Sequence, residues 1–294
     1  MNKLKQSITG LLAGLTLALL SESALADEQS AQAAMEDPSN PLVQVRTSRG
    51  SFYIELFPSA APRNVSHFIA LAEGTAELID PETQERVEGK FYANTYFHRV
   101  IPGLLTQGGA ARRDFDPKPS TKLVDEINAR QLGLHQMSAF NALGQPNPLL
   151  NLANKEDLDK YVLQPLYQKM GILSASALEN RQFEVIETLR SLSLQQVYEN
   201  MGYRYNSLLA TRPALRASVG MASSEPNANG TQFFILNDDA PWLRGRVTIV
   251  GRVVEGMDIV DRINQLSRVG DAEREANLNN ATMIFDISPV TATQ

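Results

Sequence analysis

FHRVIPGLLTQGG, residues 97–109, is an apolar stretch with the texture of a β-strand that turns through Ile101-Pro102-Gly103. It carries His98 and Arg99 side by side. A buried strand has no ordinary use for a guanidinium group, because burying an unpaired charge is costly. The stretch therefore indicates a strand whose arginine serves a function.

The composition is typical of a globular protein that is long enough to bury a core. The chain has 294 residues, of which 43% are hydrophobic and 20% charged. Its net charge of −6 argues against broad binding to a nucleic-acid backbone, which needs clustered Lys and Arg. The absence of cysteine excludes disulfides, thiolate metal sites and cysteine nucleophiles.

The N-terminus, residues 1–26, has the layout of a secretory signal peptide. Lys3 and Lys5 precede the apolar run ITGLLAGLTLALL, and Ala24-Leu25-Ala26 is a small-x-small cleavage site. The alternative is a membrane anchor, but the run is shorter than the roughly 20 residues that a spanning helix needs. We therefore expect cleavage after Ala26, export to the periplasm, and a disordered leader over residues 27–40.

Patterns on both sides of the quoted stretch are typical of a mainly β domain. Residues 41–57 have the alternation of two strands around a Ser-Arg-Gly turn. Residues 59–74 indicate a helix, with Pro62 in its first turn and Gly74 as its C-terminal cap. Strand patterns resume after residue 214, followed by a helix within 256–266 and a closing strand within 281–290.

The middle of the chain has a helical pattern instead. Apolar residues recur there at helical spacing and predict one longer amphipathic helix. They are Phe183, Ile186, Leu189, Leu194, Val197 and Met201. We interpret such stripes as helix packing, with a peptide-binding groove as the alternative.

The ordinary enzyme templates do not fit this sequence. Its three histidines, His67, His98 and His135, are not paired at a metal-ligand spacing. No Gly-x-Ser-x-Gly elbow, phosphate loop or dinucleotide fingerprint is present. We therefore expect neither a metal nor a cofactor.

Four blocks, taken in order, carry a resemblance to a known family. They are TSRGSFYIELFPSAAPRNVSHFIALAEG, YFHRVIPGLLTQGG, MASSEPNANGTQFFI and WLRGRVTIVGRVVEGMDIVDRI. They resemble the cyclophilin family of peptidyl-prolyl cis-trans isomerases. The resemblance implies a closed eight-stranded antiparallel barrel capped by two helices and formed by residues 41–127 and 214–292. Residues 128–213 would then be an inserted α-helical subdomain, because they far exceed an ordinary connection.

The resemblance also implies roles for individual residues. Arg99 matches the catalytic arginine, and Gln107 matches the glutamine that holds it and contacts substrate. The positions that match the substrate cleft are Leu104, Leu105, Ala222, Gln232, Phe234, Trp242, Leu243 and Val247. His98 should not share the face of Arg99, because neighbouring strand residues point to opposite sides. We interpret His98 as a structural residue behind the site, with direct catalysis as the alternative.

Four positions depart from the family pattern, among them Ser224 and Glu225, which replace a small apolar residue and a glycine in the loop MASSEPNANG. Leu104 stands where the family usually has a phenylalanine of the proline pocket, and Val247 where many members have a histidine. A missing aromatic face removes about 1 kcal/mol of contact with a proline ring, which would lower efficiency without abolishing it. Trp242, a cyclosporin contact in the family, is kept, so the resemblance implies cyclosporin as a ligand, although Leu104 and Val247 change the same surface.

Two functions from different classes follow. In the first, the protein is an exported isomerase that speeds Xaa-Pro rotation in unfolded or partly folded exported proteins, and Arg99 stabilises the twisted amide. In the second, it is a non-catalytic chaperone that grips Pro-containing clients through the cleft and the insertion. The insertion is either a stabilising appendage or a client-holding surface. Neither function involves nucleic acid, nor stable membrane insertion once the signal peptide is cleaved.

Overall fold

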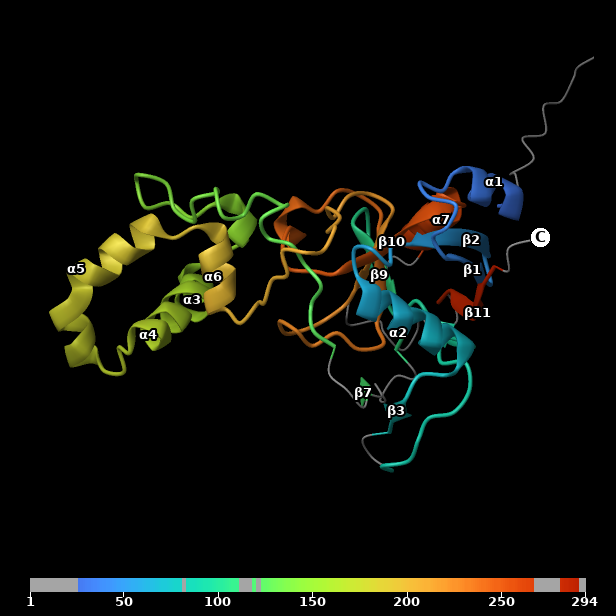
Figure 1. Cartoon of the computed structure of the whole chain (residues 1–294), viewed down its shortest axis with the longest axis horizontal. Helices are drawn as coiled ribbons and strands as arrows, with labels where there is room; N and C mark the ends of the chain where they lie inside the picture. Colours follow the sequence, from blue (N-terminus) through green and yellow to red (C-terminus); the bar gives the residue numbers. More distant parts are fainter. Residues whose placement is uncertain (1–25, 81–82, 111–117, 120–122, 267–280, 291–294) are drawn as a thin grey trace, which may run out of the picture.

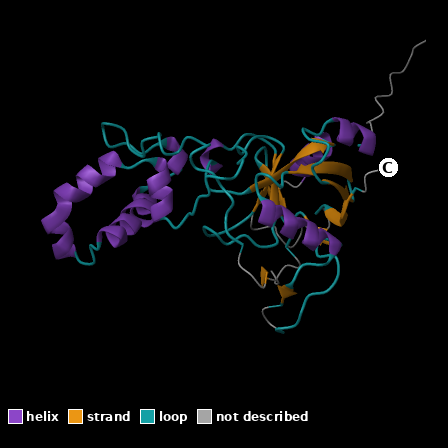
Figure 2. Ribbon diagram, viewed as in Figure 1, coloured by secondary structure: helices purple, strands orange, loops and turns teal. Residues whose placement is uncertain are grey.

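The molecule has a β-sheet at one end and a group of helices at the other. The computed structural model describes residues 26–80, 83–110, 118–119, 123–266 and 281–290. Figure 1 shows the helical group α3–α6 at the far end from the sheet, and Figure 2 shows that the strands stay at their own end. None of the helices in these ranges has the length and apolar character to cross a membrane. The predicted signal peptide lies outside the described residues, apart from Ala26.

Within the described residues the main sheet has nine strands, and all neighbouring strands in it are antiparallel. The strands are β1 (Leu42–Thr47), β2 (Gly50–Leu56), β4 (Thr95–Tyr96), β5 (Arg99–Ile101), β6 (Leu105–Gly108), β8 (Ser218–Met221), β9 (Phe233–Leu236), β10 (Ile249–Glu255) and β11 (Met283–Pro289). Their order across the sheet is β4-β11-β1-β2-β10-β8-β9-β6-β5. A separate two-stranded sheet pairs β3 (Leu78–Ile79) with β7 (Lys118–Pro119). The mainly β, antiparallel architecture is confirmed.

The two edges of the main sheet are formed by neighbouring pieces of the chain. Only Phe97 and His98 separate β4 from β5, and neither of them is in strand conformation. Strand β4 pairs with β11 and β5 with β6, while Tyr96 also forms an isolated bridge to Ala110. The expected count of eight strands therefore does not match the nine found within the described residues.

The sheet curls around a core that two helices help to bury. Helix α2 (Pro62–Glu73) starts with Pro62, whose fixed φ suits a first turn, and stops at Gly74, which has a φ of 81°. It packs against β10 and β11, while α7 (Met257–Leu266) packs against β2 and β6. The buried core includes Phe52, Ile54 and Phe68, each of them 0% exposed. The helices predicted within 59–74 and 256–266 are confirmed.

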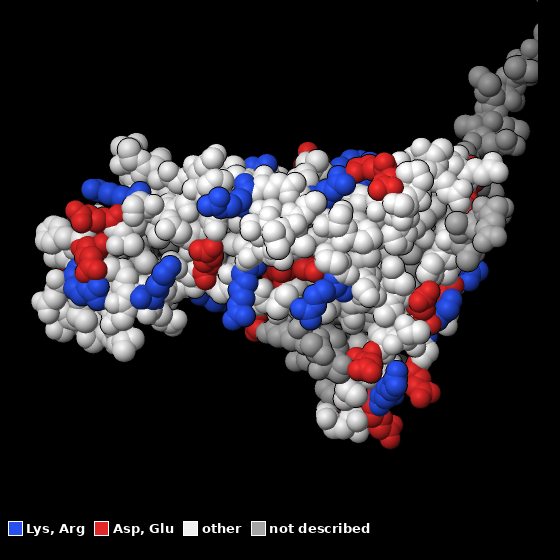
Figure 3. All heavy atoms as spheres, viewed as in Figure 1, with Lys and Arg blue, Asp and Glu red and all other residues white. Residues whose placement is uncertain are grey.

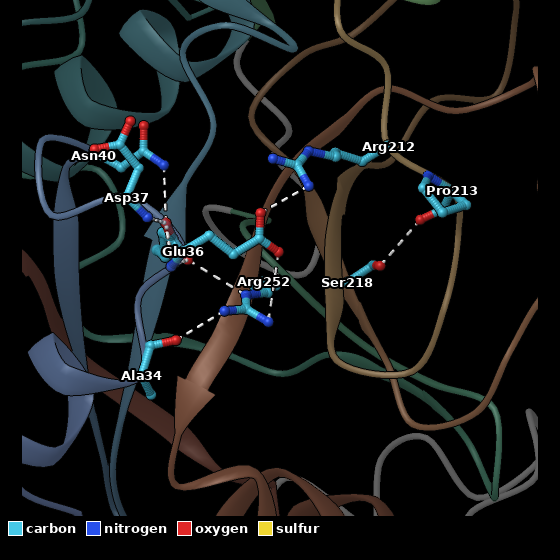
Figure 4. Close-up of polar contacts among 9 residues, drawn as sticks. Ala34, Glu36, Asp37, Asn40, Arg212, Pro213, Ser218 and Arg252 are labelled. Carbon is cyan, nitrogen blue, oxygen red and sulfur yellow. Dashed lines mark hydrogen bonds and ion pairs between the residues drawn. The ribbon is translucent and has the colours of Figure 1, made fainter. Parts of the chain in front are cut away.

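The leader differs from the disordered segment that we expected over residues 27–40. It contains helix α1 (Glu28–Ala33), which is capped by the Asp27 side chain. Glu36, Asp37 and Asn40 of the leader donate hydrogen bonds to Glu55 of β2. Figure 4 shows these leader residues beside Arg252 of β10. The leader folds here because the outer face of β2 presents Tyr53 and Glu55, which would be poorly covered without the leader.

Glu55 is a fully buried carboxylate, and four groups satisfy it. It accepts hydrogen bonds from the backbone N–H of Glu36 (3.0 Å), the backbone N–H of Asp37 (3.1 Å), Asn40 Nδ2 (2.8 Å) and Arg252 Nε (3.3 Å). The Glu36 carboxylate in turn lies 2.8 Å from Arg212 Nη1 and 3.6 Å from Arg252 Nη1. The leader is thus tied both to the sheet and to the end of the 128–213 region.

The 128–213 region contains a set of short helices with a core of its own. The elements are η1 (Pro148–Leu150), α3 (Lys155–Leu158), the π-helical turn η2 (Asp159–Leu163), α4 (Gln164–Met170), α5 (Ala175–Ser191) and α6 (Leu194–Asn200). Their core includes Leu134, Leu166 and Tyr198 and is separate from the core of the sheet.

The single long amphipathic helix predicted within this region is wrong. The chain leaves the helix at Leu192, and Ser193 starts α6 with a capping box to Gln196. Phe183 is 77% exposed and Ile186 44% exposed, whereas Leu194 and Val197 are buried. Phe183 and Ile186 therefore face solvent, whereas Leu189, Leu194 and Val197 pack in one core on both sides of the break.

Candidate active site

Residues on four neighbouring strands form one row across the sheet. Arg99 of β5 pairs with Gln107 of β6, Gln107 with Phe234 of β9, and Phe234 with Gly220 of β8. Directly opposite residues project to the same face of a sheet. The register therefore places a guanidinium, an amide and a phenyl ring side by side.

Gly220 makes room for the ring of Phe234. A Cβ atom on Gly220 would fall inside van der Waals contact of three atoms of that ring. The ring can lie over the backbone of β8 because that position carries no side chain, and Phe234 is 5% exposed. Sequence reasoning missed Gly220, although a glycine inside a strand often marks a close approach.

A chain of hydrogen bonds fixes the polar part of the row. Gln107 Nε2 donates to Gln232 Oε1 at 2.7 Å, so its Oε1 is turned towards Arg99 and accepts from Nη1 at 3.1 Å. His98 Nε2 lies 3.2 Å from the same Gln232 oxygen. Because that oxygen only accepts, Nε2 carries the hydrogen in this contact. His98 thus joins the network through Gln232, and its structural role stays a prediction.

An apolar cluster adjoins the row. Its half-buried members keep part of their surface exposed, whereas Leu105 and Phe234 are buried within it. It brings together seven of the eight predicted cleft residues: Leu104, Leu105, Ala222, Phe234, Trp242, Leu243 and Val247. The eighth, Gln232, is joined to the row by its bond to Gln107. The structure therefore gathers all the predicted residues at one place.

Asn264 of α7 holds the turn between β5 and β6, and sequence reasoning missed it. Its Oδ1 accepts from the backbone N–H of Gly103 at 2.7 Å, while Nδ2 lies 3.1 Å from Ile101 O and 3.0 Å from Leu105 O. The side chain is 3% exposed. Its position four residues after Val260 places it on the apolar face of the helix, and a buried amide there needs partners.

Replacing Asn264 by Ala should lower the free energy of unfolding by about 2 kcal/mol, because the turn loses its partners away from water. Urea denaturation measures this change. Gln265→Ala is the matched control, since Gln265 is exposed on the same helix and should shift stability by less than about 0.5 kcal/mol. Equal stabilities of the Asn264→Ala and Gln265→Ala variants would show that Asn264 does not stabilise the turn between β5 and β6.

The carboxylate of Asp261, also on α7, has its own hydrogen-bond partners. Asp261 accepts from Arg216 Nη1 at 2.9 Å and from Asn237 Nδ2 at 3.1 Å. The hydrogen bond from Arg216 holds the pKa of Asp261 below its usual value. The carboxylate therefore stays ionised and bound to Arg216. Arg99, by contrast, forms no ion pair within the described ranges.

This arrangement places an exposed charged donor beside an apolar surface. Among the residues that the structure describes, no group of three His, Asp or Glu side chains could hold a metal ion. A guanidinium that is held by a single glutamine can donate to a polar atom next to a bound apolar ring. The site is suited to stabilising a change of charge distribution in such a ligand.

Comparison with known proteins identifies related chains. The family described as "Cyclophilin type peptidyl-prolyl cis-trans isomerase/CLD" matches residues 42–284. Peptidyl-prolyl cis-trans isomerase B of Streptomyces anulatus is 39% identical over 92 residues, 31% of this chain and 52% of that protein. Peptidyl-prolyl cis-trans isomerase 9 of Schizosaccharomyces pombe is 25% identical over 246 residues, 84% of this chain and 25% of that protein.

A solved structure is also similar. It is a cyclophilin type peptidyl-prolyl cis-trans isomerase of Cryptosporidium parvum, with a TM-score of 0.47 and 19% sequence identity. The match covers 86% of this chain and 99% of that one. Among the curated relatives, the chain spans about half of the Streptomyces protein and a quarter of the yeast protein.

Proposed function

Because the chain belongs to the cyclophilin-type peptidyl-prolyl cis-trans isomerase family, we propose that it accelerates rotation about Xaa-Pro bonds in exported proteins. The observation that carries the proposal is the Arg99–Gln107 hydrogen bond at the edge of an apolar cluster. In this proposal the cluster binds the proline ring, and Arg99 is the catalytic residue.

The chemistry needs no nucleophile, because no covalent bond is made or broken. Amide resonance raises a rotation barrier of about 18–20 kcal/mol. As the amide twists, the lone pair localises on the prolyl nitrogen. A guanidinium that donates to this nitrogen binds the twisted state more strongly than the planar one, which is the condition for catalysis. Uncatalysed exchange takes ~100 s. Raising this rate to about 10³ turnovers per second requires about 7 kcal/mol of stabilisation of the twisted state.

The register explains why Arg99 can play this part. Its partner Gln107 is itself held by Gln232, so the guanidinium is oriented before substrate arrives. Preorganised donors act without a reorganisation cost during the reaction. Phe234 and Leu105 would contact the proline ring, and Leu104 offers less surface there than an aromatic residue would.

Three finer features belong to the same proposal. Residues 95–101 would act as one interrupted strand that closes an eight-stranded barrel, supported by the Tyr96–Ala110 bridge. The signal-like N-terminus supports export, with the periplasm as the place of action. Unfolded exported proteins with Xaa-Pro bonds would be the substrates, and cyclosporin binding through Trp242 stays a prediction.

The surface charge agrees with a peptide substrate. On the face shown in Figure 3, basic and acidic side chains are interspersed and no large patch of one sign gathers. Recognition of a neutral Xaa-Pro segment needs no such patch, whereas a polyanion would need clustered cations.

The experiment that tests the proposal is the cis-to-trans rate of an Xaa-Pro tetrapeptide with and without the full chain. We expect a large acceleration over the uncatalysed exchange. A rate equal to the uncatalysed one would reject the enzymatic function and favour the binding module.

The second candidate, a chaperone, is favoured by exposed apolar side chains in the 128–213 region. Leu173 is 85% exposed and Phe183 77% exposed. Apolar surface of this kind can hold an unfolded chain.

The double variant Leu173→Gln/Phe183→Gln should lose most of the ability to suppress aggregation of reduced insulin, measured by light scattering. Glu187→Gln, which changes an exposed residue of α5, the helix that carries Phe183, should keep this ability. A wild-type chain without effect on aggregation would reject the chaperone.

A further inference from the structure

Residues 241–247 form one wall of the apolar cluster at the candidate active site. The segment contains the 3₁₀ turn η3 (Pro241–Leu243), and three of its side chains pack against the cluster while staying half-buried. These are Trp242, Leu243 and Val247. Trp242 is the single tryptophan of the chain. The position of this segment therefore sets where Trp242, Leu243 and Val247 meet the rest of the cluster.

The other side of the same segment packs against the 128–213 region. Tyr205 Oη donates to the carbonyl oxygen of Gly245 at 3.0 Å. A Leu134 methyl group occupies the place that a Cβ on Gly245 would need, and Gly245 has a φ of 78°. The Arg246 guanidinium lies 5.8 Å from the centroid of the Tyr198 ring, within cation–π range. Element η1 also packs against η3.

The residues of the 128–213 region that contact this segment are held in place by their own packing and hydrogen bonds. Leu134 and Tyr198 are both 0% exposed, within the core of the 128–213 region. Tyr198 Oη donates to Leu149 O at 2.8 Å, which ties η1 to α6. The rings of Tyr203 and Tyr205 are stacked, with centroids 6.4 Å apart and planes 8° apart. A wall that rests on such a core cannot move independently of it.

The hydroxyl of Tyr205 is suited to act as a permanent donor. Burial raises its pKa well above the ordinary value, and the neighbouring Tyr198 and Tyr203 raise it further. The hydroxyl therefore keeps its hydrogen at neutral pH. Gly245 is buried, so its carbonyl has little access to water as an alternative partner.

We propose that the 128–213 region positions the cleft wall, with Tyr205 and Leu134 as its positioning residues. Neither residue belongs to the apolar cluster that would bind a proline ring. They contact Gly245, and the position of Gly245 in the segment sets the positions of Trp242 and Leu243. The region is then a part of the binding site and not an appendage. The consequence for turnover rests on the proposed isomerase function, whereas the positioning itself does not.

The test uses Trp242 as a reporter in the full chain. In Tyr205→Phe and Leu134→Ala, without substrate, the Trp242 emission should shift to longer wavelength and acrylamide should quench it faster. With an Xaa-Pro tetrapeptide, KM should rise by about three- to tenfold, as the loss of one hydrogen bond predicts, while kcat changes little. Tyr205→Phe keeps the ring and its stack, so it remains informative if Leu134→Ala does not fold.

The controls separate positioning from general stability. Tyr161→Phe removes a hydroxyl elsewhere in the same region, and Leu166→Ala opens a cavity in the same core. Both should leave the Trp242 emission and KM unchanged. The proposal is overturned by unchanged emission and KM in Tyr205→Phe, or by an equal shift in Leu166→Ala. A wild-type chain without isomerase activity would reject the proposed function, while the emission result would still decide the positioning.

Discussion

Arg99→Ala should slow the catalysed isomerisation of an Xaa-Pro tetrapeptide at least tenfold, and on the order of 100-fold. The variant removes the donor to the prolyl nitrogen, while the apolar cluster that binds the ring is left intact. Because the lost interaction forms only in the twisted state, kcat should fall much more than KM rises. The side chain is exposed, so the fold should not suffer.

Two matched variants complete the measurement. Arg99→Lys keeps the positive charge but not the planar fork, and we expect an intermediate rate. Arg63→Ala removes another exposed arginine, outside the apolar cluster, and should leave the rate unchanged. Equal rates of wild type and Arg99→Ala, measured by NMR exchange or a coupled assay, would remove Arg99 from the mechanism.

Glu55→Gln should lower the free energy of unfolding by about 3 kcal/mol. The carboxylate is fully buried and accepts from the backbone N–H groups of Glu36 and Asp37 and from the side chains of Asn40 and Arg252. An amide at this place keeps only one acceptor oxygen and turns an NH₂ group towards donors. It also leaves Arg252 without its buried counter-charge.

The same carboxylate makes the protein sensitive to acid. Burial acts to raise the pKa of Glu55, but the hydrogen bonds from Asn40, the two backbone groups and Arg252 outweigh it, so the net pKa lies below the usual 4.5. A group with a lowered folded pKa stabilises the fold above its unfolded value, and this stabilisation is lost as the pH falls through the folded value. The difference in stability between wild type and Glu55→Gln should therefore be larger at pH 7 than at about pH 3.

Urea denaturation at the two pH values measures both effects. Glu73→Gln is the control, because Glu73 is an exposed carboxylate at the end of α2. It should shift stability by less than about 0.5 kcal/mol at either pH. A Glu55→Gln variant as stable as wild type at pH 7 would show that the leader is not anchored by this residue.

Local patterns predicted the elements around the site well. The hairpin of β1 and β2 follows from alternation and a short turn, and α2 from Pro62, an apolar stripe and Gly74. These features depend on residues that are close in sequence. The residues of the candidate site came from motif resemblance, and the register that aligns Arg99, Gln107 and Phe234 was not visible in any local pattern.

Other features could not be predicted in this way. Glu55 reads as a solvated strand residue, because nothing nearby in sequence shows that the leader covers it. Asn264 reads as one polar residue of an amphipathic helix, although its partners lie some 160 positions away. In both cases the partner is set by packing between distant segments, and periodicity carries no information about it.

The sequence by itself determined the family, the order of the main strands and helices around the site, and the identity of Arg99 as an exceptional residue in an apolar stretch. Only the tertiary structure decided which faces are covered: Glu55 by the leader, and Gly245 by Tyr205 and Leu134. It also decided that Phe183 stays exposed. The physical reason is that local conformation depends on neighbouring residues, whereas burial depends on contacts that form only when distant segments meet.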